Sequence, residues 1–109
     1  MNKTKYLTIV CLFAGSAALH AQTKGDAAKG KAVFDQQCSL CHEATSTAKK
    51  MGPGLKGLYK QPKLSTTGKP VNDANVIDRI NTGGNGMPPY KDLLSDADKA
   101  NVLAYLKTL

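Results

Sequence analysis

The stretch Cys38-Ser39-Leu40-Cys41-His42 decides what this sequence can encode. Two thiols three positions apart, followed at once by a histidine, are what covalent attachment of a c-type haem requires. Each thiol can add to one vinyl group of the porphyrin, and histidine is a common axial ligand on the proximal side of the iron. The motif therefore predicts one covalent haem c held by Cys38 and Cys41, with His42 as the first axial ligand.

Two other chemistries use a similar pair of cysteines. A thiol oxidoreductase activates the first thiol at a helix N-terminus, within an alternating strand and helix pattern. Here the pair ends a helix-like segment and no such alternation surrounds it. A zinc site needs four ligands, and beyond residue 21 the chain offers only Cys38, Cys41 and His42 besides carboxylates. The sequence therefore favours covalent haem over both alternatives.

Residues 1–21 have the pattern of a secretory signal peptide. Lys3 and Lys5 precede a short apolar run over residues 6–14, and small residues follow before the chain turns polar at Gln22. The segment is too short to span a membrane, and a retained membrane anchor is the alternative. We expect cleavage after Ala21, leaving a periplasmic domain over residues 22–109 with no membrane span.

The net charge of the chain bears on whether its partner is a nucleic acid or an acidic protein. Without the two lysines of the leader, 13 basic and 8 acidic residues remain, a net charge of +5. No basic run with interleaved aromatic residues is present, so we expect no nucleic-acid binding. A positive rim around the haem would favour redox partner proteins with acidic docking faces, and a generic basic surface is the alternative. The lysines expected at that rim are Lys49, Lys50, Lys56, Lys60, Lys63, Lys69 and Lys91.

Three segments have helical patterns. A helix is predicted from Gly25 to about Gln37 with Asp26 as its N-cap, and Gly30 within it would let another backbone approach closely. A second is predicted over residues 73–82, with Asp73 as N-cap and Gly83-Gly84 at its end. The third begins at Ser95 and is predicted to run to the C-terminus. Its apolar stripe comprises Val102, Tyr105, Leu106 and Leu109.

The segment over residues 43–72 is rich in glycine and proline and reads mostly as loop, with a short helical turn near 55–60. A loop this long in a small domain normally has a functional reason, and wrapping a prosthetic group is one. We expect Leu55, Leu58 and Tyr59 to contact the haem or the helices behind it.

A second axial ligand must come from elsewhere in the chain. His20 lies in the leader, so no second histidine remains, and the candidates are Met51 and Met87. Met51 follows His42 by only nine residues and would reach the opposite haem face with difficulty. Met87 lies 45 residues beyond His42 and precedes a stiff Pro-Pro pair, so we predict Met87 as the distal ligand.

These landmarks resemble the small bacterial class I cytochromes c, which carry one haem with histidine and methionine ligands. The resemblance rests on residues 30–34, 38–42, 52–55 and 86–88, and it covers nearly all of the mature chain. It implies an all-α cytochrome c fold of three to four short helices and loops around one haem, with the N- and C-terminal helices packed across each other. It also implies that the Pro53 carbonyl accepts a hydrogen bond from His42.

The resemblance implies an exported one-electron carrier with no catalytic residues, and we expect a monomer. Two alternatives stay open: a haem subunit of a periplasmic dehydrogenase or oxidase complex, and a ligand-binding or peroxidase haem with weak methionine ligation. Many relatives place a tryptophan near a haem propionate, and this chain has none. Tyr59, Arg79 and Tyr90 are the candidates to replace it, although Arg79 could equally be a solvated helix charge.

Overall fold

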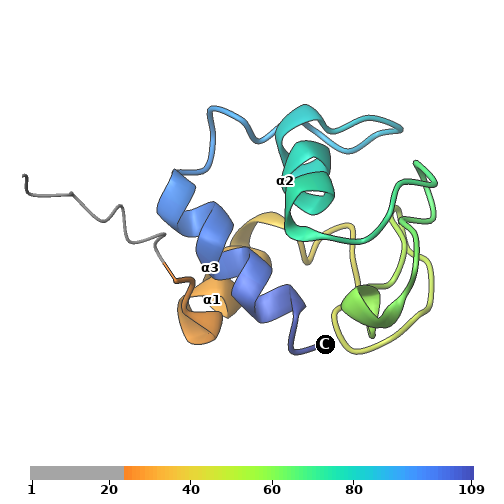
Figure 1. Cartoon of the computed structure of the whole chain (residues 1–109), viewed down its shortest axis with the longest axis horizontal. Coiled ribbons are helices and arrows are strands. Elements are labelled where there is room, and N and C mark those ends of the chain that lie inside the picture. The colour runs from red at the N-terminus through yellow and green to blue at the C-terminus, as the bar shows by residue number, and fades with distance from the viewer. Residues whose placement is uncertain (1–23) are drawn as a thin grey trace, which may run out of the picture.

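The computed structural model describes residues 24–109. This part of the chain contains three α-helices and one 3₁₀ helix, joined by loops. Helix α1 and helix α3 lie side by side, α2 sits beyond them, and the yellow-to-green loops between residues 43 and 70 extend away from α1 (Figure 1). The elements are α1 (Ala27–Gln37), η1 (Leu58–Lys60), α2 (Asp73–Thr82) and α3 (Asp96–Leu106).

The all-α prediction is confirmed, because residues 24–109 contain only two isolated β-bridges and no strand. None of the helices in this range has the length and apolar character that crossing a bilayer requires. The predicted signal peptide, residues 1–21, lies outside the described residues.

Helix α1 begins as predicted. The Asp26 carboxylate accepts a hydrogen bond from the Lys29 N–H at 3.0 Å, which satisfies one of the free donors at the helix start. The Asp26 N–H in turn donates to Oδ1 of Asn101 at 2.8 Å. The first turn of α1 is therefore tied to α3.

The two terminal helices pack closely because Gly30 has no side chain. A Cβ atom added at Gly30 would overlap the backbone carbonyl group of Asn101 in α3. Next to this contact the rings of Phe34 and Tyr105 meet at 5.4 Å between centroids and an interplanar angle of 59°, a favourable tilted arrangement. The prediction that these helices cross each other is confirmed. The core comprises Phe34, Val76, Ile80, Leu94, Val102, Leu103 and Leu106.

The predicted N-cap of α2 is wrong by one residue. Asn72 is the cap, and its side chain accepts from the Asn75 N–H at 2.8 Å. Asp73 is instead the first helical residue, where its carboxylate accepts from Nζ of Lys107 at 2.9 Å and from the hydroxyl of Tyr59 at 3.0 Å. These long-range partners draw the Asp73 side chain outward and leave the capping position to Asn72.

The predicted end of α3 is also wrong. The helix begins at the Ser95 cap as expected, but it ends at Leu106 and does not continue to the C-terminus. The Thr108 hydroxyl donates to the Tyr105 carbonyl at 2.6 Å, and the Leu109 N–H donates to the Leu106 carbonyl at 3.3 Å. The last turn therefore tightens, since an α-helix would instead pair Leu109 with Tyr105.

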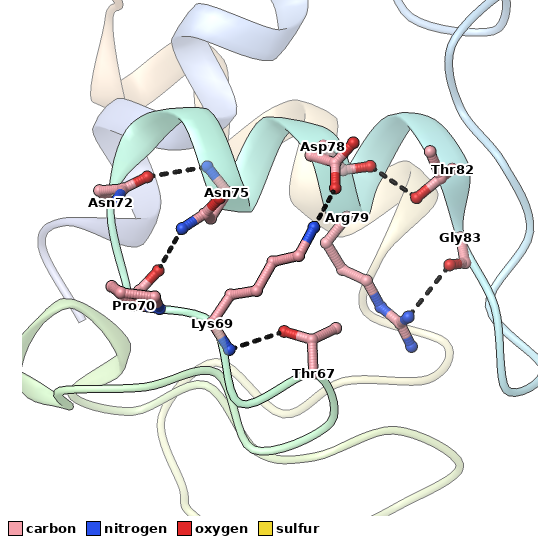
Figure 2. A network of polar contacts seen from close by, with 9 residues as sticks. All are labelled: Thr67, Lys69, Pro70, Asn72, Asn75, Asp78, Arg79, Thr82 and Gly83. Atoms are coloured by element: carbon pink, nitrogen blue, oxygen red, sulfur yellow. Dashed lines mark hydrogen bonds and ion pairs between the residues drawn. The ribbon is translucent and has the colours of Figure 1, made fainter.

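A polar network fixes the loop before α2 to one side of that helix (Figure 2). Nζ of Lys69 pairs with the Asp78 carboxylate at 3.1 Å, and the Asn75 side chain donates to the Pro70 carbonyl at 2.9 Å. Lys63 and Pro70 form one of the isolated bridges. This long loop is therefore held by side chains of α2 more than by secondary structure of its own.

Candidate haem site

The two cysteines follow α1 directly in a tight turn. Cys38 caps the helix, and its carbonyl accepts from the N–H groups of Cys41 at 3.1 Å and His42 at 3.0 Å. Both thiols are free and half-buried. Burial, with a smaller contribution from Cys41, raises the pKa of Cys38 to about 11. Catalytic thiols have a lowered pKa, so the raised pKa argues against Cys38 as the nucleophile of a thiol oxidoreductase.

The structure gives no support to a zinc site either. Among residues 24–109, no three side chains of histidine, cysteine, aspartate or glutamate come together as metal ligands.

The imidazole of His42 is oriented by a backbone carbonyl. Its Nδ1 lies 2.8 Å from the Pro53 oxygen. A carbonyl oxygen only accepts, so the proton sits on Nδ1 and the lone pair on Nε2 stays available to a metal. Gly52 permits this approach, because a Cβ atom there would lie 2.5 Å from Cε1 of the His42 ring. The contact that the resemblance implied for Pro53 is present.

Backbone hydrogen bonds fix residues 50–55 against the cysteine turn. The Gly52 N–H donates to the Cys41 carbonyl at 2.8 Å, and the Leu55 N–H donates to the Glu43 carbonyl at 2.7 Å. Nζ of Lys50 adds a salt bridge to Glu43 at 2.9 Å. The carbonyl that orients the imidazole is therefore part of a well-connected loop.

The two candidate methionines differ in their surroundings. Met51 is 74% exposed, and its sulfur lies 3.9 Å from Sγ of Cys41. Met87 is half-buried and packs against the core. Its N–H and carbonyl pair with Gly84 across a tight turn, at 3.1 and 2.8 Å. Asn85 and Gly86 provide the left-handed backbone that this turn requires.

The loop after Met87 is attached at both sides of the site. The Tyr90 N–H donates to the Ile80 carbonyl in α2 at 2.9 Å. Its hydroxyl donates to the Gln37 carbonyl, the residue before Cys38, at 2.9 Å. Burial raises the pKa of Tyr90, which keeps this hydroxyl protonated as a donor. Tyr90 therefore links the Met87 loop to the end of α1.

The three candidates for a propionate contact all have partners within the protein. Tyr59 donates to Asp73, Tyr90 donates to Gln37, and Arg79 donates to the carbonyls of Gly83 and Gly84. No local pattern predicts these partners, because Tyr59 and Tyr90 bind residues 14 and 53 positions away and the Arg79 contacts depend on the path of the chain after α2. Nor does one predict the burial of Lys99, which is only 7% exposed and donates to the Lys91 carbonyl at 2.9 Å.

The donor set fits a covalent haem. Two free thiols, an imidazole with an open Nε2 and a thioether on a separate loop are the groups that a His/Met haem c uses. Several apolar side chains around them are only half-buried and leave apolar surface that a porphyrin plane could cover. From the loops and α2 these are Leu55, Leu58, Tyr59, Leu64, Ile77, Met87 and Tyr90.

Fold and donor set together define a small single-haem protein of the class I cytochrome c type. Residues 25–106 match the model of the family described as cytochrome c oxidase, cbb3-type, subunit III, and the chain belongs to this cytochrome c family.

Individual relatives agree with this placement. The chain is 34% identical to cytochrome c6 of Synechocystis sp. over 92 residues, which cover 84% of this chain and 69% of that protein. It is 33% identical to cytochrome c-554(547) of Halothiobacillus neapolitanus over 89 residues, covering 78% and 98%. Among solved structures, cytochrome c6 of the diatom Phaeodactylum tricornutum matches with a TM-score of 0.61 and 27% identity, covering 77% of this chain and 93% of that chain.

The predictions of a small bacterial class I cytochrome c and of the all-α cytochrome c fold are thereby confirmed. Members of this class carry one covalently bound haem c and transfer electrons, and the chain is an electron-transfer protein, not an enzyme.

Proposed function

We propose that the chain is an exported one-electron carrier in which a single haem c is six-coordinate. Cys38 and Cys41 form the thioether bonds, and His42 and Met87 are the axial ligands. The observation that carries the proposal is the 2.8 Å contact between Nδ1 of His42 and the Pro53 carbonyl, which leaves Nε2 as the free ligand atom.

Each of these residues has a distinct physical role. The Pro53 carbonyl fixes the tautomer of His42 and makes its imidazole more basic. The Met87 thioether is a soft, weak ligand that favours the reduced state. When bound, the haem supplies the reversible Fe(III)/Fe(II) couple. The hydrogen bonds of loops 50–55 and 84–90 keep both ligands in place, so little rearrangement accompanies electron transfer.

We also propose that the protein is exported. Residues 1–21 act as a signal peptide cleaved after Ala21, and residues 22–109 form the periplasmic domain. The support is the pattern of the leader, with its basic start, short apolar run and small residues. The covalent haem agrees with it, because c-type haem attachment in bacteria takes place outside the cytoplasm.

The haem-attachment experiment separates this proposal from other uses of the motif. The protein is produced with its leader in a host that makes cytochromes c, and its mass is measured after denaturation. Wild type should keep one haem, the single variants Cys38→Ala and Cys41→Ala should each lose one thioether bond, and the double variant should hold no covalent haem. A double variant that still carries covalent haem would contradict the assignment.

We propose that exposed lysines around the haem form the docking surface for the redox partner. All seven lysines expected at the rim are exposed. Two of them pair with acids, Lys50 with Glu43 and Lys69 with Asp78, and no acid within residues 24–109 pairs with the other five. We expect these five to guide an acidic redox partner towards the haem, with association that weakens as salt screens the charges.

Charge reversal tests this docking surface. The double variant Lys56→Glu/Lys60→Glu should slow electron transfer with an acidic partner and flatten its dependence on ionic strength. Lys29→Glu, a change at an exposed lysine of α1, is the control and should behave like wild type. Rates that are independent of salt in the wild type would remove the electrostatic part of the proposal.

A second candidate, a haem subunit of a larger complex, is favoured by the comparisons. The matching family is described as an oxidase subunit. A relative named cytochrome bc1 complex cytochrome c subunit, from Corynebacterium diphtheriae, is 29% identical over 84 residues, which are 27% of that protein. Co-purification with a stable partner at moderate salt would favour the subunit, whereas a monomer that exchanges electrons with several partners would favour the carrier.

A further inference from the structure

Arg79 lies in the last turn of α2, and its side chain reaches the two glycines that follow the helix. Its two terminal nitrogens donate to the carbonyls of Gly83 at 3.1 Å and Gly84 at 3.0 Å, and Figure 2 shows the bond to Gly83. A guanidinium is a rigid planar fork of donors, so it can satisfy two neighbouring carbonyls at once. Its positive charge also suits the C-terminal end of a helix.

The two carbonyls that Arg79 binds belong to the base of the Met87 turn. The Gly84 carbonyl also accepts the Met87 N–H at 3.1 Å, and the Gly84 N–H donates to the Met87 carbonyl at 2.8 Å. Gly83 packs so closely on this turn that an added Cβ would overlap the Met87 carbonyl oxygen. Arg79 therefore contacts the peptide groups that fix where the Met87 side chain begins.

We propose that Arg79 is a positioning residue for Met87, holding the base of the turn closed so that the thioether stays on the iron. This inference rests on the proposed role of Met87 as axial ligand. The far side of the same turn is anchored separately by Tyr90, whose N–H donates to Ile80. Loss of Arg79 frees one side of the turn while the other side stays attached.

The consequence is a change in how often Met87 leaves the iron. An added ligand such as imidazole binds only when the distal position is open, so its apparent dissociation constant equals the intrinsic constant divided by the open fraction. Anything that loosens the turn increases the open fraction and tightens imidazole binding. A residue that serves only global stability leaves this ratio unchanged in the folded protein.

Two substitutions at Arg79 show whether the planar guanidinium or only its positive charge holds the turn. Arg79→Lys keeps the positive charge but places it on one compact ammonium, without the planar fork that serves both carbonyls. Arg79→Gln removes the charge as well. Asp78→Asn is the matched control, because Asp78 lies on the same helix as Arg79 but its carboxylate pairs at 3.1 Å with Lys69 in the preceding loop and does not contact the Met87 turn.

The experiment measures imidazole binding to the ferric haem-loaded protein and amide hydrogen exchange at Gly84 and Met87. Both Arg79 variants should bind imidazole about tenfold more tightly, equivalent to about 1.4 kcal/mol. They should lose protection at these two amides while the amides of α1 stay protected. Asp78→Asn should match wild type in both measurements.

The outcomes separate the inference from the function on which it rests. Arg79→Gln indistinguishable from wild type would overturn the positioning role, whereas an Arg79→Lys variant alone that matches wild type would overturn the planar fork, because the charge would then suffice. Loss of protection throughout α1 would overturn the positioning role as well, because Arg79 would then serve global stability. Met87→Ala supplies the reference for a fully open site. If Met87→Ala leaves imidazole affinity unchanged, Met87 is not the ligand and both proposals fail. If it tightens binding while the Arg79 variants do not, only the positioning role fails.

Discussion

Replacing Gly30 by alanine should destabilise the folded protein, although alanine is the better helix former. The added methyl group would overlap the Asn101 carbonyl and lie 2.9 Å from Cβ of Tyr105. Helix propensity favours alanine by about 1 kcal/mol, whereas overpacking a well-packed core costs about 1–3 kcal/mol. The upper end of that range applies, because backbone cannot rotate aside and the buried Phe34 and Val102 loosen as well. The net loss is about 2 kcal/mol, or about 8–16 °C in Tm for a domain of this size.

Urea and thermal unfolding of the haem-loaded protein, followed by far-ultraviolet circular dichroism, measure this loss. Ala32→Gly, an exposed change in the same helix, is the matched control and should cost about 1 kcal/mol through helix propensity alone. A Gly30→Ala protein as stable as wild type, or more stable, would show that the close approach of α1 and α3 does not limit the fold.

Three further substitutions test contacts around the site. The Lys107 ammonium holds the pKa of Asp73 below its usual value, so Asp73→Asn should cost less than about 1 kcal/mol at neutral pH for this exposed pair. In urea titrations the difference from wild type should shrink as the pH falls below 3.8, because the carboxylate is protonated first in the unfolded chain and then, at its lowered pKa, in the folded protein. Tyr90→Phe removes the bond to Gln37 and should cost about 1 kcal/mol in the same assay. Gly52→Ala should displace the proximal imidazole, cost about 1–3 kcal/mol and shift the reduction potential; an unchanged potential would count against the Pro53 contact.

Local features of the sequence were enough to predict the start of α1, the end of α2 and the start of α3. Each of these boundaries depends on a residue type that acts through its neighbours, such as the Asp26 and Ser95 caps and the glycine after Thr82. The N-cap of α2 was predicted one residue late because Asn72 and Asp73 are both good caps. Their distant partners decide between them, since Lys107 and the 58–60 turn occupy the Asp73 carboxylate.

The donor residues of the site could be predicted because few residue types can hold a haem. The contacts that depend on the path of the chain could not. Covalent haem was predicted from one pentapeptide, and Met87 was predicted as the distal ligand because no second histidine lies beyond residue 21 and Met51 follows His42 too closely. The contacts of Arg79 depend on how the chain reverses after α2, which no local pattern specifies. The burial of Lys99 is unpredictable for a related reason: lysine is almost never buried, and here its ammonium finds the Lys91 carbonyl in the loop before α3.

The visible spectrum of the purified ferric protein tests the central claim most directly, with Met87→Ala and Met51→Ala measured beside wild type. The account predicts a low-spin spectrum with a methionine–iron charge-transfer band that disappears in Met87→Ala and persists in Met51→Ala, since Met51 faces solvent. A high-spin wild type that binds carbon monoxide tightly when reduced, or a band that survives in Met87→Ala, would contradict it.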